Sequence, residues 1–213
     1  MKNIFAFLLC FMMASFAYAQ KDPKALKVLD AMSNKYQKMD AFSASFTQTL
    51  ENKMEDIKDS FNGNILVAGT KYRLEASGQV IYNNGKTIWT WLKEDEEVNI
   101  SNNDAEDGSF DIAGIYDMYK KGYKYLYLEK AAVDGKPVDV VDLVPENHDQ
   151  SIFKIRMKIN QKTHQLMAWE IFDRSGINYF YTINNFTENP KVTEADFKFD
   201  TSAHPDVEVV DLR

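Results

Sequence analysis

Apolar and polar residues alternate with a period of two along much of this chain, and this alternation limits the available folds more than any other feature. The pattern is clear in Phe42–Leu50, Phe153–Ile159 and Ile177–Ile183, where apolar residues occupy most alternate positions. Successive side chains of a β-strand point to opposite faces, so each segment predicts a strand with one apolar face. A sheet built from such strands needs another layer to cover its apolar side.

Turn sequences divide the rest of the chain into further short strands. Asn83-Asn84-Gly85 predicts a tight hairpin because Asn and Gly tolerate positive φ, and Asp134-Gly135 and Ser175-Gly176 predict similar turns. A charged, solvated connection is expected over Glu51–Asp59. Roughly ten consecutive strands joined by short turns indicate one antiparallel meander. The other predicted strands are Phe61–Val67, Lys71–Ala76, Gln79–Tyr82, Thr87–Leu92, Tyr123–Lys130, Val138–Val144 and Gln165–Phe172.

Two segments have helical spacing instead. Asp22 suits an N-cap and Pro23 a first turn, and apolar residues recur at threes and fours from Leu26 to Met39. The segment Asp111–Lys121 also has apolar residues at helical spacing. We therefore expect a mainly β (α+β) fold: a curved antiparallel sheet that forms a half-open, unclosed β-barrel, covered by a lid of short α-helices.

The first nineteen residues have the pattern of a secretory signal peptide. A positively charged start precedes the apolar run Ile4–Phe16, and Ala17 and Ala19 occupy the two positions that a signal peptidase reads. The run is too short to span a hydrocarbon core of about 30 Å. We predict that residues 1–19 are cleaved and that residues 20–213 form a single exported domain.

Composition and motif content argue against several classes of function. The formal net charge of −7 argues against binding nucleic acid or an anionic lipid surface. The three His residues lie in turn-like contexts without the spacing of metal ligands, and Ser175 does not lie in a nucleophile elbow. The single cysteine, Cys10, lies in the predicted signal peptide, so the exported chain would have no disulfides. We therefore predict no catalytic residue, no metal site and no cofactor.

The chain is rich in aromatic residues, with 3 Trp, 11 Tyr and 14 Phe. For each ring taken alone, an ordinary sheet core is the alternative explanation. A half-closed sheet, however, leaves a concave apolar surface that helices can cover without filling, and such a surface suits a long-chain ligand. The residues that we predict to line this cavity are Ile65, Tyr72, Leu74, Trp89, Trp91, Ile155, Met157 and Trp169. The residues that we predict for the lid are Ile112, Ile115 and Tyr119.

Several motifs in order along the chain resemble one known family. The strand Phe42–Gln48 has the form Phe-x-Ala-x-Phe-x-Gln, and Asn84–Trp89 is similar to an Asp-Gly-Lys-Thr-φ-Trp hairpin. Phe61–Ile65, Lys71–Glu75 and the C-terminal end follow in the same register. This combination resembles LolA, the family of periplasmic carriers of outer-membrane lipoproteins, over essentially the whole predicted mature chain.

The resemblance implies a function and a set of partners. A member of this family would take acylated lipoproteins from an inner-membrane ABC transporter, shield their acyl chains in a half-barrel, and deliver them to an outer-membrane acceptor. It would be a periplasmic monomer, without enzymatic activity and without a cofactor. The family often has an Arg-Pro pair before the third strand, with the Arg latching the lid. Here that stretch is Val67–Thr70, without Arg or Pro, so the way in which the lid is held stays open.

Two other functions remain as alternatives. The outer-membrane acceptor of the same fold would need a lipidated Cys at the mature N-terminus, and the sequence after Ala19 contains none. A secreted hydrolase with an unrecognised site would need a polar cleft with a perturbed acid or base. The identity of the cargo, the number of bound acyl chains and the acceptor stay open at this point.

Overall fold

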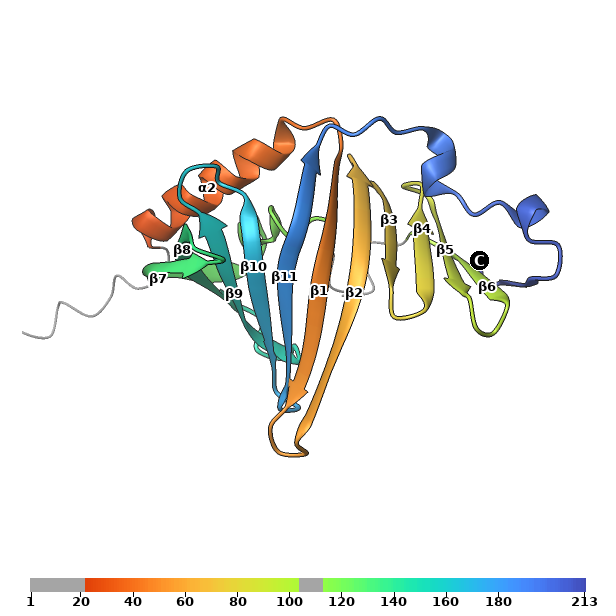
Figure 1. Cartoon of the computed structure of the whole chain (residues 1–213). Helices are drawn as coiled ribbons and strands as arrows, with labels where there is room; N and C mark the ends of the chain where they lie inside the picture. The colour runs from red at the N-terminus through yellow and green to blue at the C-terminus, as the bar shows by residue number, and fades with distance from the viewer. Residues whose placement is uncertain (1–21, 104–112) are drawn as a thin grey trace, which may run out of the picture.

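The computed structural model describes residues 22–103 and 113–213. These residues form one helix, three 3-10 turns and a sheet of 12 strands in the order β12-β6-β5-β4-β3-β2-β1-β11-β10-β9-β8-β7 (Figure 1). The strands are β1 (Phe42–Asn52), β2 (Ile57–Ala68), β3 (Lys71–Ala76), β4 (Gln79–Asn83), β5 (Thr87–Leu92), β6 (Glu97–Asn102), β7 (Tyr123–Val133), β8 (Lys136–Pro145), β9 (Ile152–Asn160), β10 (Leu166–Asp173), β11 (Ile177–Glu188) and β12 (Glu208–Asp211). The helix is α2 (Pro23–Gln37), and the 3-10 turns are η1 (Met118–Lys120), η2 (Glu194–Phe197) and η3 (Thr201–Ala203).

The sheet is antiparallel except at one edge, where β12 pairs parallel with β6. The strand β1 lies in the middle because it pairs with β2 on one side and with β11 on the other. The two edge strands of the order, β7 and β12, are not neighbours, so the sheet stays open. The unclosed antiparallel sheet expected from the alternation is therefore confirmed.

The helix α2 forms where its N-terminal signals predict it. The carboxylate of Asp22 accepts a hydrogen bond from the Lys24 backbone N–H at 2.8 Å, and Pro23 follows at the first helical position. The helix buries one stripe of residues against the sheet: Ala25, Leu29, Met32, Ser33 and Tyr36. In Figure 1 it lies beside the half of the sheet that contains β7–β10.

The second expected helix is not present in the described residues. Residues 113–117 form turns, and η1 follows them with one 3-10 turn. The backbone N–H groups of Asp117 and Lys120 donate to acceptors three residues earlier, Gly114 and Asp117, which is turn and 3-10 geometry. Gly114 has low helix propensity, and so short a segment cannot sustain a helix without strong local preference. The described lid therefore contains one α-helix rather than several, and Asp111 and Ile112 lie outside the described residues.

The charged connection expected over Glu51–Asp59 is shorter than predicted. The strands β1 and β2 continue to Asn52 and Ile57, which pair directly, and only residues 53–56 form the turn. The Asn52 side-chain oxygen accepts hydrogen bonds from the backbone N–H groups of Met54 (3.0 Å) and Glu55 (3.4 Å). This local bonding closes the turn and lets the ladder run on through charged residues.

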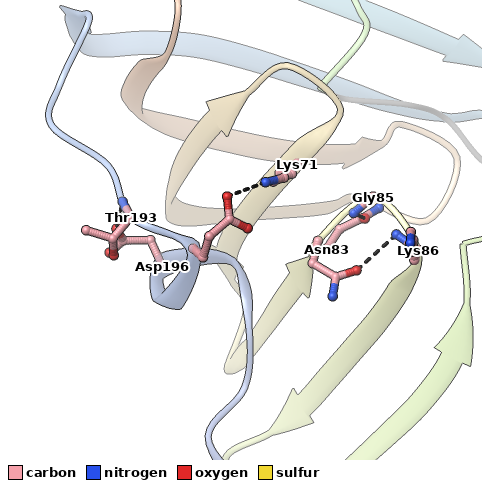
Figure 2. Close-up of polar contacts among 8 residues, drawn as sticks. Lys71, Asn83, Gly85, Lys86, Thr193 and Asp196 are labelled. Atoms are coloured by element: carbon pink, nitrogen blue, oxygen red, sulfur yellow. Dashed lines mark hydrogen bonds and ion pairs between the residues drawn. The ribbon is translucent and has the colours of Figure 1, made fainter.

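The C-terminal segment after β11 crosses to the other half of the sheet (Figure 1). The Lys71 ammonium of β3 pairs with the Glu194 carboxylate at 2.5 Å (Figure 2). Thr193 and Asp196 form a capping box at the start of η2, in which the Asp196 carboxylate accepts from the Thr193 N–H at 2.7 Å. Close by, the Asn83 side chain accepts from the Gly85 N–H at 2.7 Å, and Gly85 adopts a φ of 89°. The hairpin turn predicted from Asn83-Asn84-Gly85 is thereby confirmed.

Candidate functional site

The ladder register divides the sheet residues between two faces. Residues that lie directly opposite each other share a face, so Ile65, Leu74 and Ile81 lie on one face together with Thr90. We call this the inner face, because α2 packs on it through the largest hydrophobic cluster. The opposite side is the outer face. The faces are distinguished in the same way across all of β2–β6, where no bulge interrupts the pairing.

The inner-face cluster joins the helix, the sheet and the segment after residue 113. Leu29, Met32 and Tyr36 of α2 pack with Ala113, Ile115 and Tyr119 and with side chains of β1, β2 and β7–β10. Six of the eight predicted lining residues are part of this assembly: Ile65, Ile155, Met157 and Trp169 are buried in it, and Tyr72 and Leu74 are half-buried against it. The lid residues Ile115 and Tyr119 are also buried there, whereas Ile112 lies outside the described residues.

Trp89 and Trp91 do not face the inner cavity, and their predicted placement with the other six residues is corrected by the structure. Trp89 lies opposite Tyr82, which lies opposite Arg73, so this row alternates with the row of Leu74 and belongs to the outer face. Both Trp residues form a second hydrophobic cluster with Tyr82 and with Phe199 of the C-terminal segment. The ring centroids of Trp91 and Phe199 are 5.5 Å apart.

Sequence reasoning missed this second cluster because it treated all sheet aromatics as one set. The available signal was the apolar content of the tail, where Phe199 and Val207 occur among polar residues. The structure shows that these residues cover the outer face of β4–β6. His204 also packs there, with its ring centroid 4.5 Å from that of Trp91.

A small apolar cavity remains between α2 and the inner face. Its volume is about 30 Å³, far below the ~300–1,000 Å³ of typical ligand pockets. Three of the predicted residues line it: Ile65, Trp169 and Ile115. The lining residues that sequence reasoning missed are Tyr36, Phe42, Ala44, Phe46, Leu166, Ile183 and Phe186. In this closed state the inner face is filled by the protein's own side chains.

Aromatic contacts dominate the packing around the cavity. Tyr36 of α2 stacks on Tyr116 with a centroid distance of 5.0 Å and an interplanar angle of 8°. Burial raises the pKa of the Tyr36 hydroxyl, whose oxygen accepts a hydrogen bond from the Leu166 N–H at 3.3 Å. Trp169 stacks on Tyr181 at 4.5 Å and 6°. No acceptor in the described part of the structure receives a hydrogen bond from the buried Trp169 indole N–H.

A polar network fastens the segment after residue 113 to α2. The Asp117 carboxylate accepts hydrogen bonds from the Ser33 hydroxyl, from the Gln37 amide at 2.9 Å and from the Lys120 ammonium at 2.7 Å. The Tyr119 hydroxyl donates to the Asp30 carboxylate at 2.6 Å. We call these residues the Asp117 network: Asp30, Ser33, Gln37, Asp117, Tyr119 and Lys120.

The network stabilises the ionised form of its central carboxylate. Partial burial acts to raise the pKa of Asp117, but hydrogen bonds from Lys120, Ser33 and Gln37 outweigh it and hold the pKa below its usual range. Burial, and then the hydrogen bond to Asp30, raises the pKa of Tyr119 above its usual value. The network therefore joins α2 to the lid segment with one carboxylate as its hub.

Residues with catalytic or metal-binding potential are scattered over the described ranges. His148 lies in the turn before β9, His164 in the turn before β10 and His204 against Trp91. Within residues 22–103 and 113–213, no group of three or more His, Cys, Asp or Glu side chains is placed to hold a metal ion. None of the helices in these ranges is both long enough and apolar enough to cross a membrane.

Comparison with known proteins gives one family and several similar folds. The family model of the outer membrane lipoprotein carrier protein LolA matches residues 37–200. An uncharacterized conserved protein from Thermus thermophilus superposes with a TM-score of 0.61 at 13% identity, over 88% of this chain and 99% of that one. The Mycobacterium tuberculosis lipoprotein LppX superposes with a TM-score of 0.51 at 13% identity, over 81% of this chain and 99% of that one. No curated protein matches the chain in sequence.

The two structures share the fold with this chain, which is all that 13% identity supports. The family match carries more, because it begins at the last residue of α2 and runs through all of β1–β11 and η2. It therefore includes every strand that contributes to the inner-face cluster. On this evidence the chain belongs to the family of the outer membrane lipoprotein carrier protein LolA.

Proposed function

We propose that this protein is a periplasmic carrier that holds the acyl chains of lipoproteins between the inner face and α2. In this proposal it takes its cargo from an inner-membrane ABC exporter and passes it to the outer membrane. The observation that supports it best is the apolar, aromatic-lined cavity under α2, at the centre of the largest hydrophobic cluster. The family match agrees with a binding and sorting role, and the predicted signal peptide agrees with a place outside the inner membrane.

The small volume of the cavity requires that binding be coupled to opening. An acyl chain cannot enter about 30 Å³, so α2 and the lid segment must move away from the inner face first. Burial of a sixteen-carbon chain contributes on the order of 10 kcal/mol, at about 0.8 kcal/mol per CH₂. This gain has to offset the loss of contacts such as those of Leu29 and Met32. A carrier that must release its cargo benefits from this partial cancellation.

The unpaired indole N–H of Trp169 suits the chemistry of an acylated ligand. A buried donor without an acceptor costs about 1–3 kcal/mol, and of the two such indoles in the described residues, Trp91 and Trp169, only Trp169 lines the cavity. Acyl chains are attached to lipoproteins through ester and amide carbonyls, which are good acceptors. In the proposal, Trp169 donates to one such carbonyl when the cargo is bound.

A binding assay with an acylated peptide tests the proposal. Leu74→Glu places a charge on the inner face at a half-buried position, and uptake measured by native mass spectrometry should be lost. The matched control is Val209→Glu on the edge strand β12, where the side chain is 48% exposed and uptake should stay normal. Equal uptake by both variants, or no uptake by the unmodified protein, would refute the carrier function.

A second variant tests the carbonyl contact separately. Trp169→Phe keeps an aromatic ring beside Tyr181 and removes the donor, so affinity for the acylated peptide should fall roughly 3- to 10-fold. Affinity for a peptide with an alkyl ether chain should not change.

Cell fractionation distinguishes the related acceptor function, since an acylated, membrane-bound product would favour the outer-membrane acceptor.

A further inference from the structure

A hollow of about 350 Å³ lies in the outer face of the sheet, where β11, β1, β2 and β3 run side by side. Its volume is within the range of small-ligand pockets, unlike that of the cavity under α2. It is lined by the polar side chains of Ser43, Ser45, Asn64, Asn185 and Thr187, by the charged side chains of Arg73 and Glu75, and by Leu66. We call this hollow the outer groove, and we propose that it binds a sugar that carries an acidic group.

The ladder brings these side chains into adjacent rows. Ser45 lies opposite Asn185 of β11 on one side and opposite Asn64 of β2 on the other. The row of Ser45 continues from Asn64 to Glu75 of β3. In the next row Ser43 lies opposite Thr187, and the row continues through Leu66 of β2 to Arg73 of β3. The groove therefore presents hydroxyl and amide groups, each able to donate and accept, across three strands.

A β-bulge adds a further amide to this face. The pairing of β1 with β11 shifts between Ser45 and Phe46, so Asn184 is an additional residue on β11. As a result two consecutive asparagines bond on the outer face: Asn184 donates to the Thr47 hydroxyl and Asn185 to the Ser45 hydroxyl, both at 3.0 Å. Bulges commonly re-aim side chains beside binding sites.

Arg73 supplies the positive charge of the groove. Its guanidinium lies over the Tyr82 ring at 5.3 Å from the centroid, which holds the group beside the groove. In the described residues no hydrogen bond or ion pair joins Arg73 to a neighbour. The Glu75 carboxylate, which also lines the groove, is paired with Lys93, and the charges of Lys93 and Arg73 lower its pKa. A guanidinium with free donors is suited to bind a carboxylate or phosphate in bidentate fashion.

The position of the groove excludes other kinds of ligand. It lies in the middle of the sheet, where the backbone groups of β1 and β2 are already paired on both sides, so an extended peptide cannot add as a strand. Most of the side chains that line it are polar or charged, with Leu66 as the apolar exception on the outer face, and such a lining is a poor environment for an acyl chain. A ligand with several hydroxyls and one anionic group satisfies both the polar rows and Arg73, and an acidic sugar has this composition.

The proposal is tested by titrating the protein with four probes and monitoring its backbone amide chemical shifts by NMR. The probes are glucuronic acid, glucose 6-phosphate, glucose and inorganic phosphate. At least one of the two acidic sugars should shift the amides of Ser45, Asn64 and Asn185 in a saturable way. Glucose and inorganic phosphate should bind at least tenfold more weakly than that sugar, because each satisfies only part of the groove. The two acidic sugars together show whether a carboxylate or a phosphate is preferred.

Arg73→Gln should weaken binding of the acidic sugar roughly 10- to 100-fold, as expected for loss of charge-assisted hydrogen bonds. The matched control, Arg213→Gln at the C-terminus, should leave it unchanged. Uptake of an acylated peptide should be normal in both variants, so this test is independent of the carrier function. The proposal fails if neither acidic sugar binds, if phosphate or glucose alone binds equally well, or if Arg73→Gln has no effect.

Discussion

Removal of the hub of the Asp117 network should make the proposed cargo cavity easier to open. Asp117→Ala deletes the acceptor for Ser33, Gln37 and Lys120. The Ser33 hydroxyl counts most, because this residue is 1% exposed and its hydrogen bond to a charged group is worth about 1.5–3 kcal/mol. The Lys120 pair adds little, because both side chains are about one-third exposed or more. We expect a total loss of about 2 kcal/mol in the closed state.

This loss has two measurable consequences if the open state is the one that takes up cargo. The first is a lower thermal midpoint, since the folded, closed protein loses about 2 kcal/mol of stability. The second is a gain in affinity for an acylated peptide, by up to roughly 30-fold, because the closed state competes less well with the open one. A merely structural contact would produce the first effect without the second.

Fluorescence titration with a labelled acyl peptide measures the affinity, and calorimetry measures the midpoint. Asp206→Ala, at an exposed turn position, is the control and should change neither quantity. If Asp117→Ala lowers the midpoint but leaves the affinity equal or weaker, the network does not restrain opening. The reasoning that α2 must leave the inner face would then be refuted.

Three further predictions concern stability. Gly63→Ala should destabilise the fold by about 1–3 kcal/mol in chemical denaturation, because a Cβ there would lie 2.4 Å from the Phe46 ring; an unchanged midpoint would contradict the packing. Asp142→Ala should cost about 2 kcal/mol or more, since it leaves the partly buried Arg156 guanidinium without its bidentate partner (2.7 and 2.9 Å), and a neutral result would show that water replaces it. The lowered pKa of Asp117 means that its contribution is present above the usual carboxyl range and is lost as pH falls through the folded-state value. Stability between about pH 5 and pH 2 should therefore fall less steeply in Asp117→Asn than in the unmodified protein.

Ten of the twelve strands could be predicted from the sequence, because apolar and polar residues alternate along many of them and turn sequences separate them, whereas β6 and β12 were not predicted. In β9 the charged Arg156 separates Ile155 from Met157, and in β10 Glu170 separates Trp169 from Ile171. In the structure the apolar residues of the two strands lie opposite each other. The relative facing of strands could not be predicted in this way. Whether Trp89 shares a face with Leu74 depends on the pairing register across two hairpins, and a shift of one residue reverses the answer.

The site was only partly predictable for a similar reason. The Asp117 network joins residues that are 80–89 positions apart, and nothing in the local sequence around Asp117 or Tyr119 indicates these partners. The local pattern of the second segment is helical, but in the structure residues 113–117 form turns and the polar side chains of Asp117 and Tyr119 bond to α2. The helix α2 itself was predictable because its cap at Asp22 and its apolar stripe are both local.

The closed inner face also bears on how a carrier of this kind could release its cargo. Tyr36 and Leu29 of α2 occupy the apolar surface that an acyl chain would use in the proposed carrier, so the helix would act as an intramolecular competitor for that ligand. The net binding free energy is then the gain from burying the acyl chain minus the loss from exposing the apolar side chains of α2. This difference is moderate even though burial of one acyl chain alone contributes on the order of 10 kcal/mol. Release would not leave a large apolar surface in water, because α2 covers it again. Substitutions that weaken α2 packing should therefore tighten binding and slow release, whereas substitutions on the sheet side should weaken binding.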